Sequence, residues 1–159
     1  MGWGWDNFMT EIPHFKAFRN QDLPELEEMI FALYREDPCE ERMSHQKVER
    51  TVEELLLYPE KGTITMFCVN EVVVGYAIVI YYWSNEYAGN IASIDEFYIK
   101  PFWRRKGIGT SFIEYASKAK AGDVKGLQLE VTPLNERAFA YYSRHGFAPA
   151  KNRHLFKKL

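Results

Sequence analysis

The spacing of apolar positions divides the first part of the chain into one short strand and two helices. Residues 15–19 alternate apolar and charged side chains, which predicts a first strand. A helix is expected over residues 22–37, because a capping carboxylate and a proline open it, apolar residues recur at helical spacing, and Pro38 stops it. A second helix with an apolar stripe is expected over residues 44–57.

The pattern then changes to runs rich in β-branched and aromatic residues. Residues 63–69 and 72–83 predict a hairpin around the turn Asn70-Glu71, and residues 91–100 predict the next strand. The rest of the chain predicts further elements in this order: a basic loop at 102–109, a helix carrying Phe112 and Ile113, a strand at 127–131, a helix at 135–144, and a last strand or hairpin at 147–159.

This order of elements predicts an α/β fold. The strand-loop-helix-strand unit in the second half should bring its two strands together in parallel or nearly so. We expect a mixed central sheet with helices on both faces. The chain of 159 residues shows no linker or internal repeat, so we expect a single domain over residues 1–159, with residues 1–12 as an N-terminal extension.

Charge and composition exclude several classes of function. Twenty basic and 22 acidic side chains give a net charge of −2, so no general attraction to nucleic acid or to an anionic membrane is expected. No apolar run approaches the roughly 20 residues that cross a bilayer. Cys39, Cys68 and the four histidines lack metal-ligand spacing, so no metal site is expected. We expect a reduced, cytoplasmic setting with both thiols as packing residues.

A basic, glycine-containing loop lies between a predicted strand and a predicted helix. Free backbone N–H groups and the positive end of the helix dipole should converge there, and glycine lets a bulky anion approach the backbone, which suits a diphosphate. The dinucleotide fingerprint would need glycine at Phe112, and the Gly-Lys-Ser/Thr of the P-loop is absent. Without other evidence, the loop could equally be a solvated helix entry. Its residues are Arg104, Arg105, Lys106, Gly107, Ile108, Gly109 and Thr110.

Two blocks of sequence resemble the GNAT superfamily of N-acetyltransferases. Arg104-x-x-Gly107-x-Gly109 is similar to the family's Arg/Gln-x-x-Gly-x-Gly/Ala signature, and it stands, as in the family, between a strand and a helix. The segment Asn135-x-x-Ala138-x-x-x-Tyr142-x-x-x-Gly146-Phe147 is similar to the later block. The resemblance runs from residue 15 to the C-terminus and implies acetyl-CoA as cosubstrate. The bulky pair Phe102-Trp103 departs from many relatives.

The resemblance also implies roles for individual residues. The pantetheine arm of the cosubstrate is expected to pair with the backbone of Phe97, Tyr98 and Ile99, and to contact Asn135, which could equally cap the last helix. Tyr142 matches the tyrosine that protonates the departing thiolate; without the family match, it would be read as a core residue.

Asp95 and Glu96 are candidates for the general base. Adjacent carboxylates on a strand point to opposite faces unless a bulge re-aims one of them. Asp95 lies nine residues before Arg104, a spacing at which relatives with polyamine-like acceptors carry an acidic residue. Both could instead be solvated or ion-paired strand residues.

Aromatic and acidic residues just before this strand favour a cationic acceptor. We therefore expect a small-molecule amine, such as a polyamine, an aminoglycoside or an amino-acid derivative. The same residues could pack under helices or in a homodimer contact. A protein lysine or N-terminus as acceptor, and a noncatalytic acyl-CoA-binding module, remain alternatives. The residues are Tyr81, Tyr82, Trp83, Glu86 and Tyr87.

Overall fold

The computed structural model describes residues 12–118 and 123–159, so the predicted N-terminal extension lies outside the described residues except for Ile12. The chain forms two compact units, of which the first ends at Leu129 and the second runs from Glu130 to Leu159. The prediction of a single domain stays a prediction.

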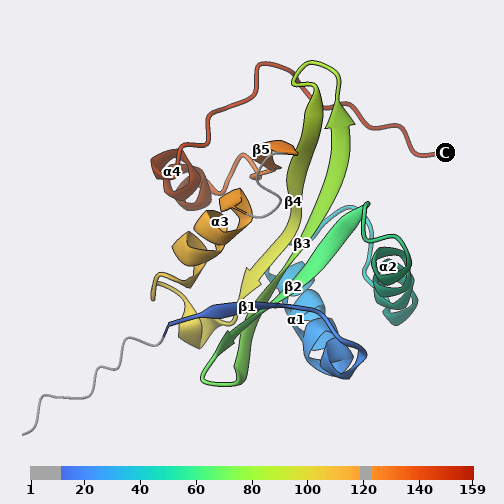
Figure 1. The fold of residues 1–159 in the computed structure, drawn as a ribbon, viewed down its shortest axis with the longest axis vertical. Coiled ribbons are helices and arrows are strands. Elements are labelled where there is room, and N and C mark those ends of the chain that lie inside the picture. Colours follow the sequence, from blue (N-terminus) through green and yellow to red (C-terminus); the bar gives the residue numbers. More distant parts are fainter. Residues whose placement is uncertain (1–11, 119–122) are drawn as a thin grey trace, which may run out of the picture. The chain divides into compact units, whose positions relative to one another are not determined.

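The first unit contains one five-stranded sheet (Figure 1). The strands lie in chain order, β1-β2-β3-β4-β5; the first three pairs are antiparallel, and β4 and β5 are parallel, as predicted. The strands are β1 (His14–Ala17), β2 (Gly62–Val69), β3 (Val72–Ser84), β4 (Gly89–Ile99) and β5 (Val124–Leu129). The helical elements are η1 (Asn20–Asp22), α1 (Leu23–Glu36), α2 (His45–Leu57), η2 (Pro101–Trp103) and α3 (Ile108–Lys118).

Helices cover both faces of this sheet. Because successive strand residues point to opposite sides, Met66, Tyr76 and Ile78 pack with α1 and α2. Phe67 and Ala77 pack with α3 on the other side. The predicted fold class, a mixed sheet with helices on both faces, is confirmed.

One turn and one helix cap show how local sequence sets these elements. Asn70 and Glu71 adopt positive φ values of 47° and 66°, the left-handed pair that closes a two-residue hairpin. The Ser44 hydroxyl accepts a hydrogen bond from the Lys47 N–H at 3.3 Å, which caps α2. The predicted hairpin and the start of the second helix are confirmed.

Asp22 stands at the N-cap position of α1, but its side chain makes no capping hydrogen bond to the helix, so the predicted capping carboxylate is wrong. Its buried carboxylate turns back along the chain, where it accepts a hydrogen bond from the Arg19 N–H at 2.9 Å and pairs with Lys16 at 2.8 Å. The ion pair with Lys16 competes for the carboxylate and ties β1 to the start of α1.

The two cysteines differ in their exposure to solvent. Cys68 is buried in β2, as expected for a packing residue, but Cys39 is exposed between α1 and α2, so its assignment to packing is wrong. Pro38 ends the amphipathic pattern before Cys39 can join the apolar face of α1. Among the described residues, no helix has both the length and the apolar character needed to cross a bilayer.

The second unit contains α4 (Glu136–Arg144). The Asn135 Oδ1 accepts a hydrogen bond from the Ala138 N–H at 3.1 Å, which caps this helix. The prediction of a strand or hairpin over residues 147–159 is wrong, because this segment forms neither. A strand needs a backbone partner, and no residue of this unit is assigned to a strand. Leu155, Phe156 and Leu159 are exposed.

Candidate active site

The predicted phosphate loop contains left-handed residues, a feature of the concave anion-binding loops called nests. Arg105 and Gly107 have positive φ values of 63° and 80°. The Ser111 N–H donates to the Gly107 carbonyl at 3.0 Å, which makes Gly107 the cap of α3. The N–H groups of Ile108 and Gly109 therefore have no acceptor within the helix.

The approach to Gly107 is open. A Cβ atom built on this residue would meet nothing within 4 Å. The left-handed backbone, the open approach and the amino end of α3 fit a diphosphate such as that of acetyl-CoA. Gly109 and Thr110 lie in the first turn of α3, and the φ of Gly109 is not positive.

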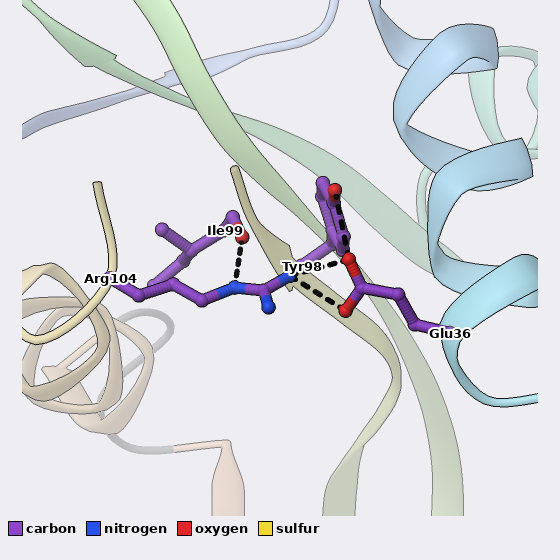
Figure 2. A network of polar contacts seen from close by, with 4 residues as sticks. All are labelled: Glu36, Tyr98, Ile99 and Arg104. Atoms are coloured by element: carbon purple, nitrogen blue, oxygen red, sulfur yellow. Dashed lines mark hydrogen bonds and ion pairs between the residues drawn. The ribbon is translucent and has the colours of Figure 1, made fainter. Parts of the chain in front are cut away.

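The Arg104 side chain is engaged within the protein. Figure 2 shows its guanidinium between β4 and the end of α1. Nε donates to the Ile99 carbonyl at 2.7 Å, and Nη2 donates to both carboxylate oxygens of Glu36, at 3.0 and 2.8 Å. The guanidinium carbon lies 5.3 Å from the centre of the Tyr98 ring. Arg104 thus joins the end of β4 to α1, and its backbone leads into the nest.

Two aromatic rings hold the side chain of Lys106, another basic residue of the loop. The Lys106 ammonium lies 4.2 Å from the centre of the Phe102 ring and 4.9 Å from that of Trp103. Phe102 is largely exposed, and Arg105 is exposed as well. The unusual pair Phe102-Trp103 therefore positions a cation beside the nest.

One edge of β4 is open beyond Ile94. The parallel pairing with β5 ends at Ile94 and Leu129, whereas β4 continues to Ile99 paired with β3 alone among the described residues. The Lys100 N–H donates to the Val74 carbonyl, so by the alternation of an antiparallel pair the backbone of Tyr98 faces β3 and that of Phe97 and Ile99 faces the open edge.

Two of the three residues predicted for the pantetheine arm thus present backbone groups to that edge. Tyr98 does not, and the Ile99 carbonyl accepts from Arg104. The Phe97 N–H and carbonyl and the Ile99 N–H remain directed at the open edge. An extended amide-containing chain, such as pantetheine, fits there as a strand fits beside a strand.

A bulge brings the two candidate carboxylates to one cavity. Glu96 pairs with Ile78 and Ile94 pairs with Val79, which leaves Asp95 as the extra residue of β4. Both Asp95 and Glu96 line a cavity of about 330 Å³. At this bulge the usual alternation of strand faces is interrupted, which is the exception that the sequence analysis allowed.

Glu96 is buried and doubly hydrogen-bonded. The Tyr34 hydroxyl donates to Oε1 at 2.9 Å, and the Tyr76 hydroxyl donates to Oε2 at 2.8 Å. Burial raises the pKa of the Glu96 carboxyl above its ordinary value; the two tyrosine hydrogen bonds oppose this shift and the charge of Asp95 adds to it. Burial, followed by the charge of Glu96, raises the pKa of both Tyr34 and Tyr76.

Sequence reasoning missed the two tyrosines. Tyr34 continues the series Leu26 and Ile30 at a spacing of four residues, which places all three on one face of α1, so this signal was available. Tyr76 lies opposite Tyr98, two residues from the partner of Glu96. That proximity depends on strand register, which no local pattern specifies.

The aromatic residues predicted to select the acceptor do not line this cavity. It lies between the sheet and the first two helices. Tyr81 lines a separate cavity that includes Phe112 of α3, and the Tyr82 hydroxyl donates to Gln128 Oε1 at 2.7 Å. Tyr82, Trp83 and Tyr87 are exposed. The residues lining the carboxylate cavity are Leu26, Ile30, Tyr34, Met43, Lys47, Val48, Arg50, Thr51, Val52, Ile64, Ile78, Asp95 and Glu96.

In the second unit, Tyr142 is half-buried between other rings. Its ring centre lies 5.2 Å from that of Tyr141 and 5.6 Å from that of Phe147. Burial, and then the neighbouring Tyr141, raise the pKa of Tyr142 to about 12. Asn135 uses its side-chain oxygen to cap α4.

Comparison with known proteins identifies the class of protein to which this fold and site belong, the acyltransferases. The acetyltransferase (GNAT) family model matches residues 26–147. Because this match covers more than half of the chain, the protein belongs to the GNAT acetyltransferase family. No protein of curated function matches the sequence.

Solved structures share the fold. A possible acetyltransferase from Clostridium difficile 630 has a TM-score of 0.82 at 24% identity and covers 94% of this chain and 99% of its own. An aminoglycoside acetyltransferase from an uncultured soil metagenomic sample, in complex with sisomicin, has a TM-score of 0.71 at 14% identity, and the match covers 92% of this chain and 96% of that one. A ribosomal-protein-alanine N-acetyltransferase from Brucella melitensis biovar Abortus 2308 has a TM-score of 0.69 at 18% identity, and the match covers 92% of this chain and 100% of that one. At these identities, the likeness concerns the fold.

Proposed function

We propose that this protein is an N-acetyltransferase that moves the acetyl group of acetyl-CoA to a primary amine. The observation that carries the proposal is the position of Asp95 and Glu96. Both line a cavity, and they immediately precede Phe97, whose backbone faces the open edge of β4. A site for an amine thus adjoins a site for an acyl-bearing chain.

Acetyl-CoA fits the residues of the first unit. The nest at Arg105 and Gly107 would hold the diphosphate, and the backbone of Phe97 and Ile99 would pair with the amides of pantetheine. The cosubstrate supplies an acetyl group on sulfur, so transfer to an ammonium ion forms an N–C bond, breaks the C–S bond, and yields an amide, a thiol and one proton.

The amine must lose a proton before it can attack. A primary amine is almost fully protonated at neutral pH, because its pKa lies near 10. A base with a pKa closer to neutrality accepts that proton more readily, and burial shifts Glu96 in this direction. The charge of Asp95, exposed on the same cavity, attracts the ammonium ion.

Tyr34 links the base to the cavity. Its hydroxyl donates to Glu96 and its side chain is part of the cavity wall. A hydroxyl with a raised pKa keeps its own proton, so it fixes one oxygen of Glu96 and leaves a lone pair of its own for the incoming ammonium.

We assign Tyr142 as the acid that protonates the leaving thiolate. Its pKa of about 12 keeps the phenol protonated at neutral pH. The same shift makes the phenol a weaker acid than a thiol, whose pKa is about 8.5, so Tyr142 would act mainly by donating a hydrogen bond to the sulfur as negative charge develops there.

The acceptor is a small amine in this proposal. A cavity of about 330 Å³ is at the lower end of the range for small-molecule sites. Its two carboxylates support a cationic group as the part of the acceptor that enters first.

The proposal is tested by following thiol release from acetyl-CoA with primary amines and with alcohols of the same carbon skeleton. We expect release with amines alone. Equal rates for amines and alcohols would contradict N-acetyl transfer. Binding of acetyl-CoA without release by any amine or peptide would instead indicate an acyl-CoA-binding module.

A further inference from the structure

The cavity beside Glu96 carries charges of both signs. Asp95 and Glu96 lie on β4, whereas Lys47 and Arg50 line the same cavity from α2. Apolar side chains make up most of the wall between them: Leu26, Ile30, Val48, Val52, Ile64 and Ile78. A ligand that fills this cavity therefore meets acidic, apolar and basic surfaces.

The helical period of α2 places the basic residues beside the core. Val48 and Val52 are buried against the sheet. Lys47 precedes Val48, and Arg50 lies two residues before Val52, so their long side chains flank the buried stripe and reach the cavity rim.

The two basic residues differ in how their charge is used. The Lys47 ammonium donates to the Arg42 carbonyl at 2.7 Å and lies 3.5 Å from a Glu41 carboxylate oxygen. The Arg50 side chain makes neither a hydrogen bond nor an ion pair with the rest of the described chain. Its five N–H donors have no acceptor among the described residues and are available to a ligand.

This distribution disfavours an acceptor with positive charge along its whole length. A polyamine that placed one ammonium at Asp95 and Glu96 would bring a second cation toward Arg50. An amine with an anionic group at its other end matches both walls, since guanidinium binds carboxylate and phosphate through paired hydrogen bonds.

We propose that the acceptor is a primary amine that also carries an anionic group, bound by Arg50, across an apolar linker. This inference rests on the proposed function and narrows its acceptor class to molecules of the amino-acid type. Arg50 determines specificity through binding, while Asp95 and Glu96 receive the amine.

The test uses matched series of acceptors with the full-length protein. ω-Amino acids with two to six methylene groups are compared with their primary amides, and thiol release gives kcat/KM for each. Aminoalkyl phosphates, compared with aminoalkyl alcohols, form a second series that distinguishes phosphate from carboxylate as the anionic group.

We expect kcat/KM to favour the anionic member roughly tenfold at the best linker length, because hydrogen bonds between charged groups favour binding and solvent partly screens Arg50. Arg50→Glu should reverse this preference. Lys118→Gln, which removes an exposed charge at the end of α3 on the opposite face of the sheet, is the control and should keep the preference.

The outcomes separate the two proposals. The inference would be overturned if amines released thiol with equal kcat/KM for the anionic acceptor and its neutral counterpart, or if Arg50→Glu left the ratio of the two unchanged. N-acetyl transfer would still stand in either case. Absence of release with every amine, with acetyl-CoA bound, would overturn the proposed function and this inference with it.

Discussion

Glu96 combines two properties that oppose each other in a folded protein. Its carboxyl is buried against the helix-covered face of the sheet, which disfavours the charged form, and its two tyrosine partners favour that form. The balance leaves its pKa above the ordinary value. A residue of this kind is poorly explained by packing alone and is well suited to accept a proton.

Glu96→Gln should lower kcat by about 10²- to 10⁴-fold, the usual contribution of a general base. In the wild type, activity should fall as the pH drops through the raised pKa of Glu96, because only the carboxylate accepts a proton. The pH–rate profile of the variant should lack this acidic limb. Glu53→Gln, on the exposed side of α2, is the control. An unchanged acidic limb in Glu96→Gln would show that another group is the base.

The same shift predicts a pH dependence of stability. Since the folded state binds the Glu96 proton more tightly than the unfolded state, this residue lowers the free energy of unfolding as the pH rises from the ordinary glutamate pKa through the folded-state value. Glu96→Gln should therefore have a higher melting temperature than the wild type above this window and little advantage below it. Parallel curves of melting temperature against pH would contradict the prediction.

Gly107 provides a matched comparison for the nest. Gly107 and Gly146 have similar φ values of 80° and 87°, and a Cβ atom on either would meet nothing within 4 Å. Alanine at each position should cost about 1–2 kcal/mol of stability through backbone strain alone. We expect Gly107→Ala also to weaken acetyl-CoA binding at least tenfold by calorimetry. Equal affinities in the two variants would argue against the nest.

At the scale of elements, β3 and β4 form the support for the site. Gly75 pairs with Ile99 at the end of β4, and a Cβ atom there would collide with the Tyr98 carbonyl oxygen and the Phe67 ring. The absence of a side chain at this position therefore lets β3 lie beside the strand whose other edge is open.

Gly75→Ala should lower the free energy of unfolding by about 1–3 kcal/mol, the usual cost of overpacking. In Gly126→Ala, the control in β5, the new methyl group would meet only Ile91 at 3.6 Å, an ordinary contact. Chemical denaturation of both variants checks this difference, and equal stabilities would contradict the close approach at Gly75.

Elements with strong local signals were predictable from the sequence. Ser44 caps α2, Asn70-Glu71 closes a hairpin, and Pro38 lies just beyond the C-cap of α1, each for a local reason. β5 starts at Val124 and ends at Leu129, about two to three residues earlier than predicted. Its bounds follow from pairing with β4, and pairing is not encoded in a short window.

The candidate site was predictable to a similar degree. The loop at Arg104 and Gly107 and the acidic pair in β4 could be found from spacing. The bulge at Asp95, the partnership of Glu96 with Tyr34 and Tyr76, and the ion pair of Arg104 with Glu36 join residues from separate elements. Such contacts result from strand register and helix packing, so no local sequence motif predicts them.

At the scale of the whole molecule, family and fold agree on acyl transfer, and the central claim concerns the atom that receives the acetyl group. Within the first unit, the open edge of β4 and the carboxylate cavity share consecutive residues of one strand. Under the proposed function, acetyl-CoA and the amine would therefore bind next to each other, and we expect direct transfer without a covalent acyl-enzyme.

The most direct test is mass spectrometry of the products after incubation with acetyl-CoA and an ω-amino acid, with fragmentation to locate the acetyl group. The account predicts an acetyl group on the amine nitrogen, one thiol released for each amide formed, and no acetylated protein intermediate. An acetyl group on the protein in place of the amine, or intact acetyl-CoA with every amine tested, would contradict it.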